Sequence, residues 1–151
     1  MSSSGTVCTD ASFVIPLVVA RPASAQAVAQ WESWREQGRE IVAPSLLYFE
    51  VTNALHRYVR AGDLLAEEGA AALRLVLSLG IRVDADPGLH VQAMRLAARF
   101  DLAAAYDAHY LALAESLGAE LWTADSRLAR AVSAELPWVR LLSVESAEKQ
   151  A

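Results

Sequence analysis

The chain has almost no cysteine, almost no lysine and no apolar run long enough to cross a membrane. Its 151 residues include one cysteine, Cys8, and one lysine, Lys149. A single cysteine cannot form an intramolecular disulfide or a cysteine-built zinc site, so we expect a reducing compartment. No apolar stretch approaches the roughly 18–20 residues of a membrane span, which favours a soluble, cytoplasmic protein with no membrane partner.

Positive charge is also scarce. The chain has 13 lysine and arginine residues against 18 acids, which gives a net charge of −5 with histidine neutral. A protein that binds nucleic acid through charge alone has a basic surface and a high pI. The acidic balance therefore excludes binding through a broad basic surface. It does not exclude an acidic pocket that binds phosphate through a metal ion.

A secretory signal is disfavoured by the charges near the N-terminus. Residues 13–20 form a short apolar run, and Ala23-Ser24-Ala25 imitates a cleavage site. No lysine or arginine precedes Arg21, whereas a signal peptide needs a positively charged segment before its apolar run. We therefore expect the apolar run to belong to the folded protein.

What the chain does have is a large share of hydrophobic residues, 54%, in short apolar runs that alternate with longer helical patterns. This alternation is typical of an α/β domain with a parallel sheet. The expected strands are residues 6–9, 40–43, 81–84, 120–123 and 139–142. The expected helices are residues 22–37, 44–60, 66–79, 86–100, 106–117 and 126–134. We expect a single domain over residues 6–144, with flexible tails at 1–5 and 145–151.

Four acidic residues stand where such a fold places its functional sites. In an open parallel sheet, ligands bind beyond the carboxyl ends of the strands, where the strand order reverses. Asp10 directly follows the first expected strand, and Asp125 lies two residues beyond the fourth. Asp107 lies in the first turn of the helix before that strand. Glu50 lies mid-helix at the border of an apolar face, where no capping role explains it.

Taken singly, all four acids have ordinary structural explanations, and Glu50 alone is typical of the border of an amphipathic helix. Asp10 and Asp125 can cap the helices that follow them, and Asp107 can complement a helix dipole. If the fold brings all four acids together, however, they cannot all stay ionised without compensation. A hard divalent cation supplies that compensation, and Mg²⁺ or Mn²⁺ suits an all-oxygen site. Because such ions bind phosphate oxygens and orient water, the pattern indicates phosphodiester cleavage.

Several segments of the chain resemble a known family. Residues 104–114, with the motif Tyr106-Asp107-Ala108, and residues 122–128, with Thr123-Ala124-Asp125, resemble the C-terminal half of a PIN domain. More narrowly, they are similar to VapC-type toxins of bacterial and archaeal toxin–antitoxin pairs. Residues 7–12 and 43–55 agree with the N-terminal half. The resemblance extends from about residue 6 to residue 144, and Ala105, where many relatives have serine, is a minor departure.

The resemblance implies a fold, an activity and partners. The fold is a three-layer α/β/α sandwich whose five-stranded parallel sheet has the order 3-2-1-4-5, so that the first and fourth strands are neighbours. The activity is that of a metal-dependent endoribonuclease, the toxin of a type II toxin–antitoxin system. The implied partners are RNA, a cognate antitoxin and a second copy of the chain in a homodimer. The implied catalytic residues, which hold one or two Mg²⁺ or Mn²⁺ ions, are Asp10, Glu50, Asp107 and Asp125, with Ser12, Asn53 and Thr123 in support.

Other polar and aromatic residues carry weaker expectations. Arg57, Arg60, Arg127 and Arg130 could flank an RNA path or be ordinary solvated charges. The spacing of His56, His90 and His109 fits no metal-ligand pattern, so we expect them on the surface. Tyr106 is expected to pack against other residues rather than to catalyse. Trp31 and Trp34 fit a dimer or antitoxin surface and the core equally well, whereas Trp122 and Trp138 are expected in the core.

Two other functions are compatible with acids that follow strands. Enzymes that form an aspartyl phosphate need a lysine opposite the acids, and the position of Lys149 in the tail argues against them. A PIN-fold module that binds RNA or protein without cutting is the second alternative. The complete set of four acids argues against this module, and metal-dependent RNA cleavage distinguishes the two functions.

Overall fold

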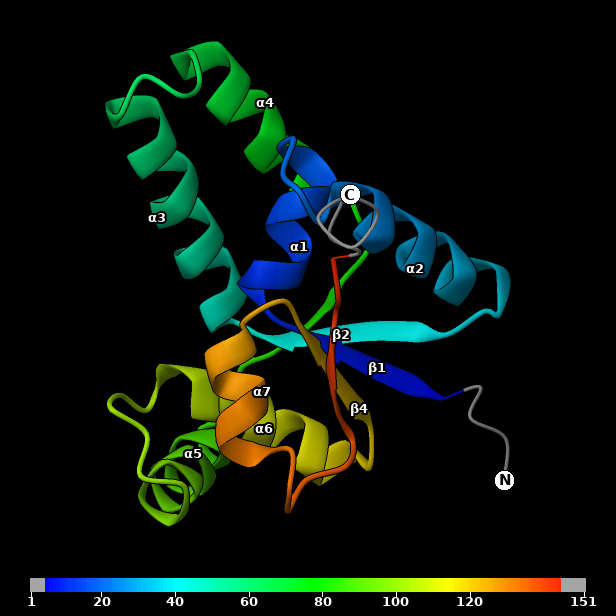
Figure 1. Cartoon of the computed structure of the whole chain (residues 1–151), viewed down its shortest axis with the longest axis vertical. Coiled ribbons are helices and arrows are strands. Elements are labelled where there is room, and N and C mark those ends of the chain that lie inside the picture. The colour runs from blue at the N-terminus through cyan, green and yellow to red at the C-terminus, as the bar shows by residue number, and fades with distance from the viewer. Residues whose placement is uncertain (1–4, 145–151) are drawn as a thin grey trace, which may run out of the picture.

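A five-stranded parallel sheet in the order β3-β2-β1-β4-β5 forms the centre of the protein (Figure 1). The computed structural model describes residues 5–144, so the tails expected at 1–5 and 145–151 lie outside the described residues, apart from Gly5. The order and the parallel pairing confirm the expected fold class. The strands are β1 (Thr6–Thr9), β2 (Glu40–Pro44), β3 (Arg82–Asp84), β4 (Glu120–Thr123) and β5 (Val139–Leu141).

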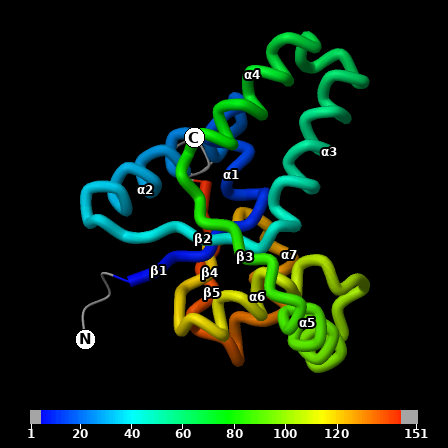
Figure 2. Tube along the Cα trace, turned by 180° about the vertical axis from the view of Figure 1, so that it is seen from behind, coloured from blue at the N-terminus to red at the C-terminus, as the bar shows by residue number. Residues whose placement is uncertain are grey.

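Helices cover both faces of the sheet. The helices are α1 (Ala11–Val18), α2 (Ser24–Glu36), α3 (Leu46–Arg60), α4 (Ala66–Leu77), α5 (Gly88–Arg99), α6 (Tyr106–Leu117) and α7 (Ser126–Val132). Both views show α1 to α4 on one side and α5 to α7 on the other, with α3 and α4 extending away from the sheet as a pair (Figures 1 and 2). None of the helices within residues 5–144 is long and apolar enough to span a bilayer.

Helix α1 was not expected from the sequence. Its residues Phe13, Val14, Ile15 and Pro16 are all buried, so the helix has no polar face and no 3.6-residue hydrophobic period by which to detect it. Its start is fixed by Asp10, which accepts a hydrogen bond from the backbone amide of Phe13. The other expected elements are present, with ends that differ by a few residues.

An aromatic cluster in the core settles the placement of two tryptophans. Trp34 is 1% exposed and stacks on Phe13 at 5.0 Å between ring centroids, and Trp31 is also buried. Trp122 of β4 lies edge-on to Trp34 at 5.6 Å. Trp31 and Trp34 therefore belong to the core and not to a docking surface. Trp122 and Trp138 are partly buried and pack against the same core.

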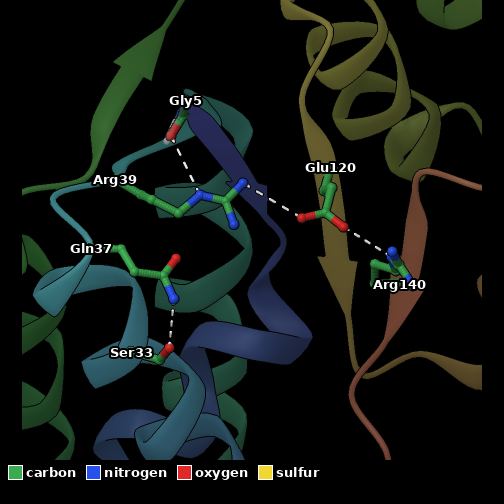
Figure 3. A network of polar contacts seen from close by, with 6 residues as sticks. All are labelled: Gly5, Ser33, Gln37, Arg39, Glu120 and Arg140. Carbon is green, nitrogen blue, oxygen red and sulfur yellow. Dashed lines mark hydrogen bonds and ion pairs between the residues drawn. The ribbon is translucent and has the colours of Figure 1, made fainter. Parts of the chain in front are cut away.

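Ion pairs join three strands at the amino-terminal edge of the sheet (Figure 3). Glu120, the first residue of β4, lies 3.5 Å from Arg39, just before β2, and 2.9 Å from Arg140 in β5. Arg39 also donates a hydrogen bond to the carbonyl oxygen of Gly5. At this edge, a partly exposed carboxylate has arginine partners on both sides.

Candidate active site

Asp10 lies at the carboxyl end of β1, where it is only 5% exposed, and its carboxylate accepts three hydrogen bonds. Oδ1 accepts from the hydroxyl of Ser12 at 2.6 Å and from the backbone amide of Phe13 at 3.1 Å. Oδ2 accepts from the hydroxyl of Thr123, the last residue of β4, at 2.5 Å. These bonds hold the Asp10 carboxylate in one orientation between two neighbouring strands.

Ser12 and Thr123 also join the loop after β1 to the loop after β4. The backbone amide of Ala124 donates to Ser12 Oγ at 2.8 Å, and that of Asp125 donates to Thr123 Oγ1 at 3.0 Å. The two hydroxyl oxygens are 3.2 Å apart. The structure thus brings Ser12, Thr123 and Asp10 together. Both hydroxyl groups therefore hydrogen-bond to a backbone amide as well as to the Asp10 carboxylate.

Asp125 caps helix α7, as the ordinary structural explanation requires. Its Oδ1 accepts from the backbone amides of Arg127 at 2.9 Å and Leu128 at 3.4 Å. Its Oδ2 makes no hydrogen bond within residues 5–144. Capping therefore fixes the carboxylate but leaves one oxygen available to a ligand.

Glu50 has a partner that the sequence did not reveal. The hydroxyl of Tyr110, on α6, donates a 2.5 Å hydrogen bond to Glu50 Oε1, on α3. Tyr110 is fully buried. The available signal was its hydroxyl, because a buried tyrosine usually finds a hydrogen-bond partner. This contact joins the helix of Glu50 to the helix that carries Asp107.

Electrostatic coupling through Asp107 connects all four acids. The pKa of Asp10 is raised to about 6. Burial is the main cause and the charge of Asp107 adds to it, while three hydrogen bonds to the carboxylate act in the opposite direction. Burial also raises the pKa of Glu50, again with a contribution from Asp107. The pKa of Asp107 itself is raised by burial and by the charge of Asp125. Asp107 thus interacts with Asp10, Glu50 and Asp125 through its charge, and the joint role of the four acids in one site stays a prediction.

No arginine or lysine among residues 5–144 forms an ion pair with any of the four acids. The ion pairs among residues 5–144 use other acids, namely Glu40, Glu115, Glu120 and Glu135. Within the same range, no group of three or more Asp, Glu, His or Cys side chains is arranged to hold a metal ion. The side chains of the four acids offer oxygen atoms only.

The remaining candidate residues lie around this site rather than in it. Asn53 is exposed on α3, one turn beyond Glu50, and no hydrogen bond joins it to the four acids in the described part of the chain. Arg57 and Arg60 are exposed on α3, and Arg127 and Arg130 are exposed on α7, all without an ion-pair partner among residues 5–144. Their contact with RNA stays a prediction.

Two expectations about aromatic side chains need correction. Tyr106 does not pack in the interior: it is 64% exposed, because the first residue of α6 points away from the core. His56 and His90 are exposed as expected, but His109 is half-buried, with Nδ1 2.8 Å from the carbonyl oxygen of Ala105. A periodicity argument could not detect either feature, since both depend on the loop before α6.

Comparisons with known proteins agree with this geometry. The sequence profile of the PIN domain matches residues 7–133. VapC ribonuclease Mb0985 of Mycobacterium bovis is 33% identical over 107 residues, which are 67% of this chain and 82% of that protein. A toxin–antitoxin complex from Klebsiella pneumoniae superposes with a TM-score of 0.67 at 19% identity, covering 91% of this chain and 98% of that one. The sarcin–ricin loop cleaving toxin VapC20 of Mycobacterium tuberculosis superposes with a TM-score of 0.66 at 22% identity, covering 83% and 95%.

The raised pKa of Asp10 predicts an unusual dependence of stability on pH. In metal-free buffer, ionisation of Asp10 costs more in the folded protein, where the pKa is about 6, than at the ordinary value of 3.8. The free energy of unfolding should therefore fall as the pH rises from 4 to 7. Asp10→Asn should remove up to about 3 kcal/mol of this fall, as measured by urea unfolding.

The matched control for this prediction is Asp63→Asn, since Asp63 is exposed. It should follow the wild-type dependence on pH. Parallel curves for the wild type and Asp10→Asn would show that the carboxylate is not destabilised by its surroundings.

Proposed function

The chain belongs to the PIN domain family, and from that premise we propose that it is a metal-dependent endoribonuclease, the toxin of a type II toxin–antitoxin pair. The observation that carries this proposal is the set of four coupled carboxylates without basic partners at the carboxyl edge of the sheet. Such a site attracts cations and repels phosphate until a cation is bound. The acidic net charge is then compatible with an RNA substrate.

The relatives support the same activity. The similar protein from M. bovis is named a VapC ribonuclease, and this chain covers most of its length. VapC20 is described as a toxin that cleaves the sarcin–ricin loop, and the K. pneumoniae structure is a toxin–antitoxin complex. By analogy, RNA is the substrate of this chain, a cognate antitoxin is its partner, a homodimer is its assembly and the cytoplasm is its compartment.

The donor set fits Mg²⁺ or Mn²⁺. All available ligands are carboxylate oxygens, which hard divalent cations prefer. Mg²⁺ usually keeps several waters and binds only one or two protein carboxylates together with substrate phosphate. No three Asp, Glu, His or Cys side chains among residues 5–144 are arranged to hold an ion by themselves, so binding would use one or two carboxylates at a time, with water and phosphate as the other ligands. We propose that Asp10, Glu50, Asp107 and Asp125 hold one or two ions. When bound, the ion supplies Lewis-acid charge at a phosphate oxygen and lowers the pKa of water.

The chain's own residues then have distinct roles. Ser12 and Thr123 orient Asp10 through the hydrogen bonds described above, and Tyr110 orients Glu50. Burial and neighbouring charge raise the pKa of the half-buried Asp107 carboxyl, which suits a group that takes a proton from an attacking water. The exposed residues Asn53, Arg57, Arg60, Arg127 and Arg130 contact the RNA backbone on either side.

Removing single carboxylate charges tests the catalytic assignment. Asp10→Asn and Asp107→Asn should each lower Mg²⁺- or Mn²⁺-dependent cleavage of structured RNA by about a hundredfold or more, because each removes a ligand or a proton acceptor. EDTA should stop the wild-type reaction and added metal should restore it. Asp63→Asn is the matched control and should cleave at the wild-type rate. Full activity of either site variant at equal protein concentration would refute the mechanism.

Co-expression tests the proposed partner. If a small open reading frame lies directly upstream, its product should bind this chain and relieve the growth arrest that the chain causes when expressed alone. A variant such as Asp107→Asn should bind the same product without arresting growth, since binding does not need cleavage. Growth arrest that persists despite binding would count against an antitoxin role for that product.

A further inference from the structure

A cavity lies beside the four acids and has no role in the site described above. It has a volume of about 330 Å³, within the range of small-ligand sites, and opens where β2 and β3 end and where α5 and α6 begin. Its lining is mostly apolar, and its chemically distinctive residues are Phe49, Asp84, Asp86, His90, Tyr106 and His109. We call it the base pocket.

The base pocket adjoins the active site through the chain itself. Phe49 immediately precedes Glu50 on α3, and Tyr106 immediately precedes Asp107 on α6. A nucleotide whose phosphate lies at the acids therefore has its own base, or that of its neighbour, within reach of the pocket.

Two aromatic rings are exposed at this pocket. Phe49 is 73% exposed and Tyr106 is 64% exposed, although large apolar side chains usually gain free energy when they are buried. Rings that remain accessible beside a phosphate-cleaving site are suited to stacking on unpaired bases. This observation favours a nucleobase over an aliphatic occupant.

The two carboxylates of the pocket, on Asp84 and Asp86, are hydrogen-bond acceptors. Asp84 and Asp86 each use Oδ1 to accept from a backbone amide, at 2.8 Å from Asp86 and 2.9 Å from Gly88 respectively. Their Oδ2 atoms make no hydrogen bond within residues 5–144. No arginine or lysine from that range lines the pocket. A phosphate group would be repelled here, whereas an amino group of a base would be bound.

The paired histidines add a further acceptor. His109 Nδ1 faces the carbonyl oxygen of Ala105 at 2.8 Å, so this nitrogen carries the proton. In the neutral ring, Nε2 of His109 then accepts from Nδ1 of His90 at 2.9 Å. This leaves Nε2 of His90 as an acceptor. The near-perpendicular packing of the two rings, at 72°, fixes the His90 side of the pocket.

We propose that the base pocket holds one unpaired nucleobase of the RNA next to the bond that is cut, and that it prefers a base with an exocyclic amino group to uracil. This inference rests on the proposed ribonuclease function. The rings of Phe49 and Tyr106 stack on the base. The acceptors of Asp84, Asp86 and His90 select its amino group.

Nucleoside binding tests the pocket without requiring metal or cleavage. Cytidine has an amino donor at C4 where uridine has a carbonyl acceptor, and only uridine carries a proton on N3. If the pocket reads the C4 group, NMR titration of the full chain should show that cytidine binds more tightly and shifts the signals of Phe49, His90 and Tyr106. Phe49→Ala and Tyr106→Ala should each weaken cytidine binding by about fivefold or more. Met94→Ala is the control, because Met94 is 75% exposed on α5 and does not line the pocket.

Asp86→Asn tests the selectivity separately from the stacking. The asparagine can keep the Oδ1 bond to the amide of Gly88 but replaces the second oxygen with a donor. The ratio of cytidine to uridine affinity should fall. The proposal would be overturned if the wild type binds both nucleosides equally well or binds neither. It would also be overturned if Asp86→Asn and Asp84→Asn both leave the ratio of cytidine to uridine affinity unchanged. Pocket signals that respond to the antitoxin but not to cytidine would identify a protein docking site instead.

Cleavage of a random-sequence RNA pool with mapped ends connects the pocket to the reaction. The wild type should enrich amino-bearing bases at one fixed position beside the cut, and Phe49→Ala should reduce that enrichment. Cleavage without any positional preference would overturn the pocket's role while leaving the ribonuclease function intact. An absence of cleavage together with selective cytidine binding would refute the proposed function and support the pocket as a nucleobase site.

Discussion

The structure is organised around four carboxylates, those of Asp10, Glu50, Asp107 and Asp125, which interact electrostatically and form no ion pair with arginine or lysine among residues 5–144. Burial raises the pKa of Asp10, Glu50 and Asp107. The charge of Asp107 adds to the shift at Asp10 and Glu50, and the charge of Asp125 adds to the shift at Asp107. The opposite edge of the sheet shows the contrast, because Glu120 there lies between Arg39 and Arg140. Two arginines thus pair with Glu120, whereas none of the four acids has an arginine or lysine partner among residues 5–144. The remaining charge is available to a metal ion.

Holding such charges in place requires a rigid frame, and the topology provides it. The order β3-β2-β1-β4-β5 makes β1 and β4 neighbours, so that Asp10 and Thr123 meet although they are far apart in sequence. Ser12 and Thr123 join the two strand ends, and Tyr110 joins α6 to α3 through Glu50. Fully buried side chains, including Trp34 and Tyr110, pack behind this frame. The hydrogen bonds from Ser12 and Thr123 to Asp10, and from Tyr110 to Glu50, therefore hold these carboxylates in place against their mutual repulsion.

The alternation of apolar runs predicted the fold class, and the family resemblance predicted the strand order; both are confirmed. The sequence also placed each of the four acids at a fixed offset from a strand or an apolar helical face, and their joint site stays a prediction. The sequence did not predict the features that depend on contacts between distant parts of the chain. Helix α1 is buried on every side and shows no period, and the hydroxyl of Tyr110 meets Glu50 from another helix. The exposure of Tyr106 depends on a loop conformation. The base pocket combines ends of four elements, which no linear pattern brings together.

The most direct test of the account is a calorimetric titration of Mn²⁺ into the metal-free protein. If uncompensated repulsion among the four acids defines the site, the wild type should bind one or two ions, and Asp107→Asn should bind at least about tenfold more weakly. Asp63→Asn should bind as the wild type does, since it changes an acid outside the site. A wild-type protein that binds no Mn²⁺, or an Asp107→Asn variant that binds it equally well, would contradict the account.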